Sequence, residues 1–134
     1  MAILKQKRAR IYKDFDLSFG KNSLSGDLNK KLDVNAVKQS MINLVMTKPF
    51  ERPFNPLLGS EINSLLFEQM DTFTSDAIQK NLIYLFKNYE PRCRITDIRV
   101  KPLYDQNEYV VSVDFHIVGI NEPQQLEVRL ERLR

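Results

Sequence analysis

The chain is poor in the residues that form disulfides and zinc sites. Its 134 residues include one cysteine, one histidine and no tryptophan. Because Cys93 is alone, it has no partner for an internal disulfide, which is typical of a protein made in a reducing compartment. One cysteine and one histidine also exclude a Cys/His zinc cluster within the chain. Disulfide-stapled scaffolds and zinc modules are therefore not expected.

Long apolar runs are also missing. The longest stretch without a charged residue, 39–47, is far shorter than the roughly 20 apolar residues that a membrane-spanning helix needs. Lys5, Lys7 and Arg8 interrupt the first residues, so they lack the apolar core of a signal peptide. We therefore expect no membrane partner and an origin in the cytoplasm.

The positive charge is concentrated at the N-terminus. The net charge is +3, but residues 1–31 carry eight Lys or Arg against three Asp, and the rest carries 12 basic and 14 acidic residues. We expect a basic arm over 1–13 and a single domain over 14–134, which is an ordinary domain size. A solvated tail, an arm that docks on an acidic partner, and a nucleic-acid contact all remain open for this arm.

The first predicted helix covers residues 34–47. Asp33 can cap its first turn, and Pro49 ends it because the residue before a proline avoids the α conformation. The next segment, 51–56, contains two prolines and should be extended, with Gly59 closing its turn. The helix is indicated by an apolar stripe made of Val34, Val37, Met41, Leu44 and Val45.

Two more helices are predicted in the middle of the chain. One begins after a cap at Ser60, and the other begins near Thr74 or Ser75 and ends at or before Glu90, because Pro91 follows. Their apolar stripes comprise Ile62, Leu65, Leu66 and Met70 in the first, and Ile78, Leu82, Leu85 and Tyr89 in the second.

The C-terminal third alternates between apolar and polar residues, which predicts strands around 98–100, 109–117 and 126–130. Polar or Gly-containing turns over 104–108 and 119–123 separate them. The predicted fold class is therefore α+β, with three helices packed on one face of a small antiparallel C-terminal sheet.

The N-terminal region holds one more short alternating segment. Phe15, Leu17 and Phe19 alternate with polar residues, which predicts a short strand. The Ser-, Asn- and Gly-rich stretch 20–26 is typical of a loop.

No catalytic signature is present, whether a Gly-rich phosphate loop or an HExxH motif. Ser112, Asp114 and His116 share one strand face, but a strand rises ~3.3 Å per residue, so Ser112 and His116 should lie ~13 Å apart. A nucleophile and its base need about 3 Å. We expect these three residues to form the polar face of a half-buried sheet.

A glycosidase-like carboxylate pair is not indicated either. Glu61 and Glu68 are expected on the solvent side of the second helix, away from its apolar stripe, so nothing predicts a raised acid pKa. Cys93 is expected to be a small, partly buried residue at the start of a strand. Three methionines are expected to pack at or near helical core positions, and they are Met41, Met46 and Met70.

Four segments together resemble the baseplate wedge family of contractile phage tails, which also includes the corresponding baseplate protein of type VI secretion systems. They are residues 33–40 (DVNAVKQS), 51–56 (ERPFNP), 66–68 (LFE) and 88–92 (NYEPR). The segments follow the family's order and spacing, and the match spans about residues 14–131.

The resemblance implies a fold and a role. Members of the family resemble the C-terminal strand-exchanging domain of tail sheath proteins, sit around the tail tube and template the first sheath ring. The implied partners are wedge core-bundle proteins and the sheath protein, with tube or hub proteins as further candidates. The implied location is the tail baseplate of a virion that is made in the host cytoplasm. We expect no cofactor, no metal and no nucleic-acid partner.

The family contacts the wedge core through its Glu-Pro-Arg motif. The partner-binding residues that the resemblance implies are Glu90, Pro91 and Arg92, together with Arg52, Pro53 and Phe54. In an extended chain Glu90 and Arg92 would lie on one side and could dock on a partner together. The alternative is a surface turn whose two charges are satisfied locally.

Two functional alternatives follow, in addition to a nucleic-acid-binding module that would use the basic arm. The first is a non-enzymatic subunit whose sheet accepts a strand from a sheath protein at one of its edges. The accepting strand is either the one near 98–100 or the one near 126–130. The second is a lysozyme-like peptidoglycan hydrolase, since some members of the family have been described as lysozyme-like.

Overall fold

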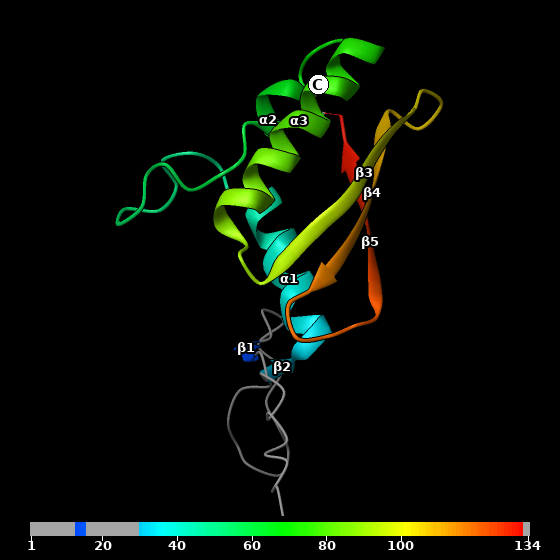
Figure 1. The fold of residues 1–134 in the computed structure, drawn as a ribbon. Coiled ribbons are helices and arrows are strands. Elements are labelled where there is room, and N and C mark those ends of the chain that lie inside the picture. Colours follow the sequence, from blue (N-terminus) through cyan, green and yellow to red (C-terminus); the bar gives the residue numbers. More distant parts are fainter. Residues whose placement is uncertain (1–12, 16–29, 133–134) are drawn as a thin grey trace, which may run out of the picture.

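The structure is a computed structural model that describes residues 13–15 and 30–132, with side chains from Val34 onward (Figure 1). Two short strands lead into a long helix, two further helices follow, and three strands complete the described chain. The elements are β1 (Lys13–Phe15), β2 (Lys30–Leu32), α1 (Asp33–Met46), α2 (Ile62–Leu65), α3 (Thr72–Tyr89), β3 (Cys93–Leu103), β4 (Glu108–Ile117) and β5 (Pro123–Glu131).

Helix α1 lies within one residue of its predicted bounds. Val37, Met41, Leu44 and Val45 are buried, as the stripe predicts. Met46 differs from the core expectation, because 56% of it is exposed. One residue after Val45, it is turned by roughly 100° from the stripe.

Helix α2 is much shorter than predicted. Ser60 does not cap it, because its hydroxyl donates to the Val45 carbonyl at 2.6 Å and its amide to the Thr47 carbonyl at 2.9 Å. After Leu65 the chain tightens into i→i+3 turns, with the Phe67 amide donating to the Ser64 carbonyl at 3.2 Å. Ile62 and Leu66 still reach the core, so the apolar spacing was informative although the predicted helix length was wrong.

Helix α3 begins at Thr72, earlier than predicted. Asp71 is its cap and accepts a hydrogen bond of 2.7 Å from the Thr74 amide. Thr74 and Ser75, the predicted starts, are buried in the first turn, and their hydroxyls donate back to the Gln69 and Asp71 carbonyls. The C-terminal end at Tyr89 confirms the stop predicted from Pro91.

The C-terminal strands form the predicted antiparallel meander in the order β3-β4-β5. Strand β3 begins earlier than the short predicted strand and contains an irregularity between Ile95 and Asp97. Cys93 is its first residue and is buried, as expected, and burial raises the pKa of its thiol to about 12. The inward residues of the other two strands are Tyr109, Val111, Val113, Phe115, Ile117, Leu126, Val128 and Leu130.

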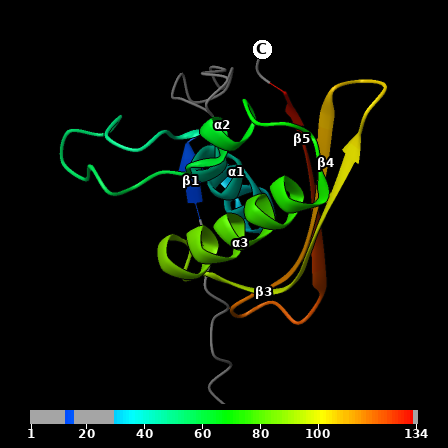
Figure 2. The ribbon, with the colours of Figure 1, turned by 90° about the horizontal axis from the view of Figure 1, so that it is seen from above.

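Both long helices lie on one side of the sheet, which confirms the predicted layers (Figure 2). Helix α3 packs along β3, and α1 contacts α3 and β5. The apolar faces of both helices and the inner face of the sheet share one core.

The N-terminal strands form a separate two-stranded antiparallel pair, with Lys13 opposite Leu32. The predicted strand through Leu17 and Phe19, the loop at 20–26 and the basic arm up to residue 12 lie outside the described residues. Strand β2 was not predicted, because the charged sequence Lys30-Lys31-Leu32 carries no alternation signal.

Candidate assembly surfaces

The segment after α3, which we call the elbow (residues 90–92), is held by a buried ion pair. Arg92 Nε donates to Glu90 Oε1 at 2.7 Å, and Arg92 Nη2 donates to Glu90 Oε2 at 3.0 Å. The Ser40 hydroxyl on α1 donates to Glu90 Oε2 at 2.6 Å. The Glu90 side chain is only 2% exposed. The elbow is therefore tied to α1 from inside the protein.

These contacts keep the buried carboxyl of Glu90 charged. Burial alone would raise its pKa, but the hydrogen bonds from Arg92 and Ser40 and the positive charge of Arg92 hold the pKa of Glu90 below its ordinary value. A buried carboxylate with such partners is stabilised only while those partners remain.

The exposed part of the elbow is Pro91, with Arg92 partly exposed beside it. Glu90 faces inward and is satisfied locally, so it can act on a partner only through Arg92. The role of Ser40 was not inferred from the sequence. The available signal was its position, because Ser40 is a polar residue within the apolar stripe of α1, three residues after Val37 and four before Leu44.

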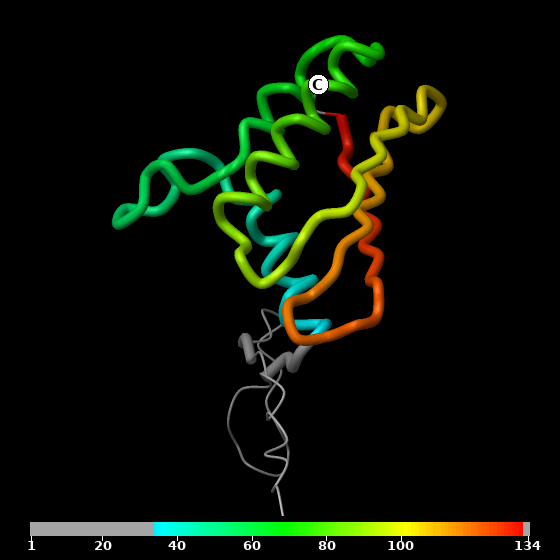
Figure 3. Tube along the Cα trace, in the orientation of Figure 1, coloured from blue at the N-terminus to red at the C-terminus, as the bar shows by residue number. Residues whose placement is uncertain are grey.

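A second surface is the loop between α1 and α2, residues 47–61, which projects from the body (Figure 3). Phe54, one of the three residues that the resemblance implies here, is 100% exposed, and Arg52 and Pro53 beside it are exposed as well. Phe50 and Leu57 of the same loop are also exposed, and exposed apolar side chains that gather in one region are typical of a surface that is covered in an assembly.

The loop is nevertheless pinned at its base. The Phe50 amide donates to the Pro56 carbonyl at 2.9 Å, and the Tyr89 hydroxyl donates to the Leu57 carbonyl at 2.9 Å. At Gly59, φ is +149°, and a Cβ added there would lie 2.6 Å from the Lys48 carbonyl carbon. Only glycine fits this close approach of two backbone segments.

No described strand pairs with the outer edge of β5. In an antiparallel sheet, successive residues point their main-chain groups alternately toward and away from the neighbouring strand. The Arg132 amide donates to the Asn107 carbonyl at 2.8 Å. Arg132, and therefore every second residue before it along β5, points its main-chain groups toward β4. The residues whose main-chain groups face outward are therefore Gln125, Glu127, Arg129 and Glu131, and no described strand pairs with them.

The other edge strand, β3, is obstructed. By the same alternation, Ile98, Val100 and Pro102 face outward. Gln79 of α3 already donates to the Ile98 carbonyl at 2.8 Å, and a proline has no amide to offer. Of the two edges that the sequence left open, β5 is better suited to accept a further strand.

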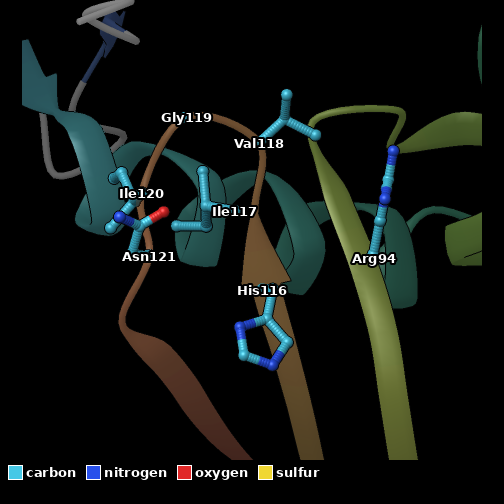
Figure 4. A pocket seen from close by; sticks show the side chains of 7 residues that line it. All are labelled: Arg94, His116, Ile117, Val118, Gly119, Ile120 and Asn121. Atoms are coloured by element: carbon cyan, nitrogen blue, oxygen red, sulfur yellow. The ribbon is translucent and has the colours of Figure 1, made fainter.

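The polar face of β4 does not form a triad. Arg99 on β3 donates to Asp114 at 2.6 Å, and no hydrogen bond among the described residues joins Ser112 or Asp114 to His116. His116 lies beside a shallow pocket of about 340 Å³ at the β4–β5 turn, where its ring and the Arg94 side chain point in different directions (Figure 4).

The carboxylate pair is also not assembled. Glu61 precedes α2 and Glu68 follows it, so no single helix carries both, and both are exposed. Over the described residues, no group of three or more His, Cys, Asp or Glu side chains is placed to hold a metal ion. No described helix combines the length and the apolar character needed to cross a membrane.

Comparison with known proteins identifies the group to which this sequence and fold belong. Residues 32–122 match the family described as baseplate wedge protein gp25. The chain belongs to the baseplate wedge gp25 family. The baseplate wedge protein gp25 of Enterobacteria phage T4 is 30% identical over 118 residues, which cover 88% of this chain and 87% of that protein.

Solved structures share the gp25-family fold. A chain of the anti-feeding prophage baseplate has a TM-score of 0.72 at 19% identity and covers 84% of this chain and 90% of its own length. A Geobacter sulfurreducens protein described as a candidate tail lysozyme has a TM-score of 0.68 at 17% identity, and the match covers 73% of this chain and 89% of that protein. A chain of a type VI secretion baseplate complex has a TM-score of 0.62 at 14% identity, and the match covers 74% of this chain and 93% of that chain.

Membership of the gp25 family confirms the predicted resemblance, and the chain is a baseplate wedge protein of contractile-tail systems. Partner contacts at the elbow and at Arg52, Pro53 and Phe54 remain predictions. The structure brings Glu90 and Arg92 together and places the loop residues on a separate projection.

Proposed function

We propose that this gp25-family protein is a non-enzymatic structural subunit of a phage tail baseplate that docks on the wedge core and templates the tail sheath. In this assignment the elbow and the 47–61 loop bind neighbouring wedge proteins, and the β-sheet receives a sheath strand. The protein thus works by presenting rigid surfaces to other subunits.

Docking at the elbow is supported by its stiffness. Pro91 restricts the backbone, and the buried pairs to Glu90 limit the freedom of Arg92. A guanidinium held in one orientation loses less entropy when it binds an acidic or carbonyl group on a partner.

Sheath templating depends on one observation, an outer edge of β5 that pairs with no strand of the described residues. A strand added there would gain main-chain hydrogen bonds whose strength depends little on side-chain identity. Hydrogen exchange of the full chain alone and with purified sheath subunits tests this. We expect amides of Gln125, Glu127 and Arg129 to become protected, and unchanged exchange along β5 in assembled sheath would overturn the proposal.

The alternative is a lysozyme-like peptidoglycan hydrolase, favoured by the description of the Geobacter protein. Glycoside hydrolysis needs two carboxylates flanking one bond, one with a raised pKa. Among the side chains that the structure describes, the carboxyls with shifted pKa values are Asp71 and Glu90, and both pKa values are lowered. A zymogram on purified peptidoglycan separates the two functions, and a cleared band at the size of this chain would favour the hydrolase.

A further inference from the structure

A pocket of about 410 Å³ lies between the 47–61 loop and the C-terminal half of α3. Its walls are mostly apolar, with Phe50 and Leu57 from the loop and Tyr84, Leu85 and Tyr89 from the helix. Phe50, Leu57 and Tyr84 are exposed large side chains. The volume lies in the range of sites that hold small ligands or single anchor side chains.

The walls of this pocket are held in place. On the loop side, the Phe50–Pro56 hydrogen bond and the close backbone approach at Gly59 fix the turn. The Tyr89 hydroxyl bridges from the helix to the Leu57 carbonyl at 2.9 Å. Because these contacts already order the loop, a bound group would not have to supply that ordering free energy.

The lining has one charged group. Glu61 contributes an exposed carboxylate, and among the described residues it takes part in no ion pair and its carboxylate accepts no hydrogen bond. The other polar lining groups are neutral, namely Asn81 and the two tyrosines. Charge complementarity therefore favours an apolar group that carries a cation next to it.

The pocket adjoins the elbow in sequence, since its lining residue Tyr89 immediately precedes Glu90. We propose that the pocket receives an apolar anchor side chain of a wedge-protein segment, with an adjacent Lys or Arg of that segment paired to Glu61. This inference rests on the proposed docking function and adds to it a partner chemistry at a site separate from Arg92.

Binding can be measured without knowing the partner. The probe is the peptide acetyl-Gly-Leu-Arg-Gly-amide, titrated into the isotope-labelled full chain and followed by amide NMR shifts. Two matched peptides replace Leu by Ser or Arg by Glu. We expect saturable shifts confined to the pocket, with the Ser peptide weaker by about tenfold or more and the Glu peptide weaker by about two- to fivefold. Absent shifts, or equal affinity for the three peptides, would overturn the inference.

Variants test the same site in assembly. Asn81→Trp fills the pocket, with Lys80→Trp as its control on the exposed side of α3, and Glu61→Lys reverses the charge, with Glu68→Lys as its control. Loss of wedge incorporation is expected for the pocket variants and not for the controls. If Asn81→Trp does not fold, the comparison of Glu61→Lys with Glu68→Lys and the three peptide titrations still test the inference.

Other outcomes remain distinguishable. If Arg92→Ala remains folded but impairs wedge incorporation, and Glu61→Lys and Asn81→Trp do not impair it, the pocket inference fails while the proposed function stands. If no variant impairs incorporation, both fail. Self-association of the chain that disappears in Glu61→Lys would identify a second copy as the occupant and would also overturn the inference.

Discussion

The Ser40 hydroxyl on α1 donates a 2.6 Å hydrogen bond to the buried carboxylate of Glu90, fifty residues later in the chain. The same carboxylate holds Arg92 through two further bonds. The conformation of the elbow is therefore set by a contact between α1 and the segment that follows α3, and it can be perturbed by mutating Ser40.

Replacing Ser40 by Ala should lower the free energy of unfolding by about 1–3 kcal/mol, because a buried carboxylate loses a hydrogen-bond donor. Urea unfolding of the full chain measures this. Ser64→Ala is a suitable control, since the Ser64 hydroxyl bonds only an exposed backbone carbonyl. Equal stability of Ser40→Ala and Ser64→Ala would contradict the role of Ser40.

Stability should fall in acid through Glu90. Its folded-state pKa lies below the ordinary 4.5, so its contribution is present above pH 4.5 and is lost as the pH falls through the folded value. In Glu90→Gln the free energy of unfolding should be lower at neutral pH and should decline less steeply below pH 4.5.

A second described carboxyl must be separated from Glu90 in this measurement. Asp71 also has a lowered pKa, caused mainly by the hydrogen bond from the Thr74 amide. The pH profiles should therefore be compared in an Asp71→Asn background, where a difference between the chain that keeps Glu90 and the Glu90→Gln variant remains expected. Parallel profiles in that background would show that Glu90 is not the linked group.

Proline at position 129 should separate folding from strand addition. The Arg129 amide faces the open side of β5, so Arg129→Pro removes no hydrogen bond to β4 and should fold about as well as Arg129→Ala. Co-sedimentation with assembled sheath should be lost only in the proline variant. Val128→Pro, whose amide faces β4, should instead be destabilised by about 1–3 kcal/mol. Undiminished sheath binding by Arg129→Pro would rule out β5 as the accepting edge.

Gly59→Ala should distort the 47–61 loop. Its φ of +149° strains any L side chain, and the added Cβ would meet backbone atoms at 2.6 Å, so a cost of about 1–3 kcal/mol or more is expected. Gly119→Ala is the control, because its φ is also positive, at +93°, but its Cβ would meet nothing within 4 Å. Thermal unfolding of both variants measures the difference, and a larger loss at Gly119 would contradict it.

Local patterns in the sequence were enough for most of the fold. The 3.6-residue stripes predicted α1 and α3, the alternation from Tyr109 to Ile117 predicted β4, and Pro91 predicted where α3 ends. Each of these signals depends on residues close together in the chain. The prediction was wrong where a distant contact replaced a local one, since Ser60 bonds to the Val45 and Thr47 carbonyls and does not cap α2.

Spacing and composition along the chain were enough to predict the α+β order and the three-stranded meander, and the resemblance of four segments was enough to predict the family to which the chain belongs. The folded chain was needed to show that Glu90 faces inward onto Ser40, that β5 is better suited than β3 to accept a further strand, and that the loop and α3 enclose a pocket. The reason is physical: helix and strand periods are local, whereas inward or outward orientation of a charge and pairing of an edge depend on segments that meet only in the folded chain.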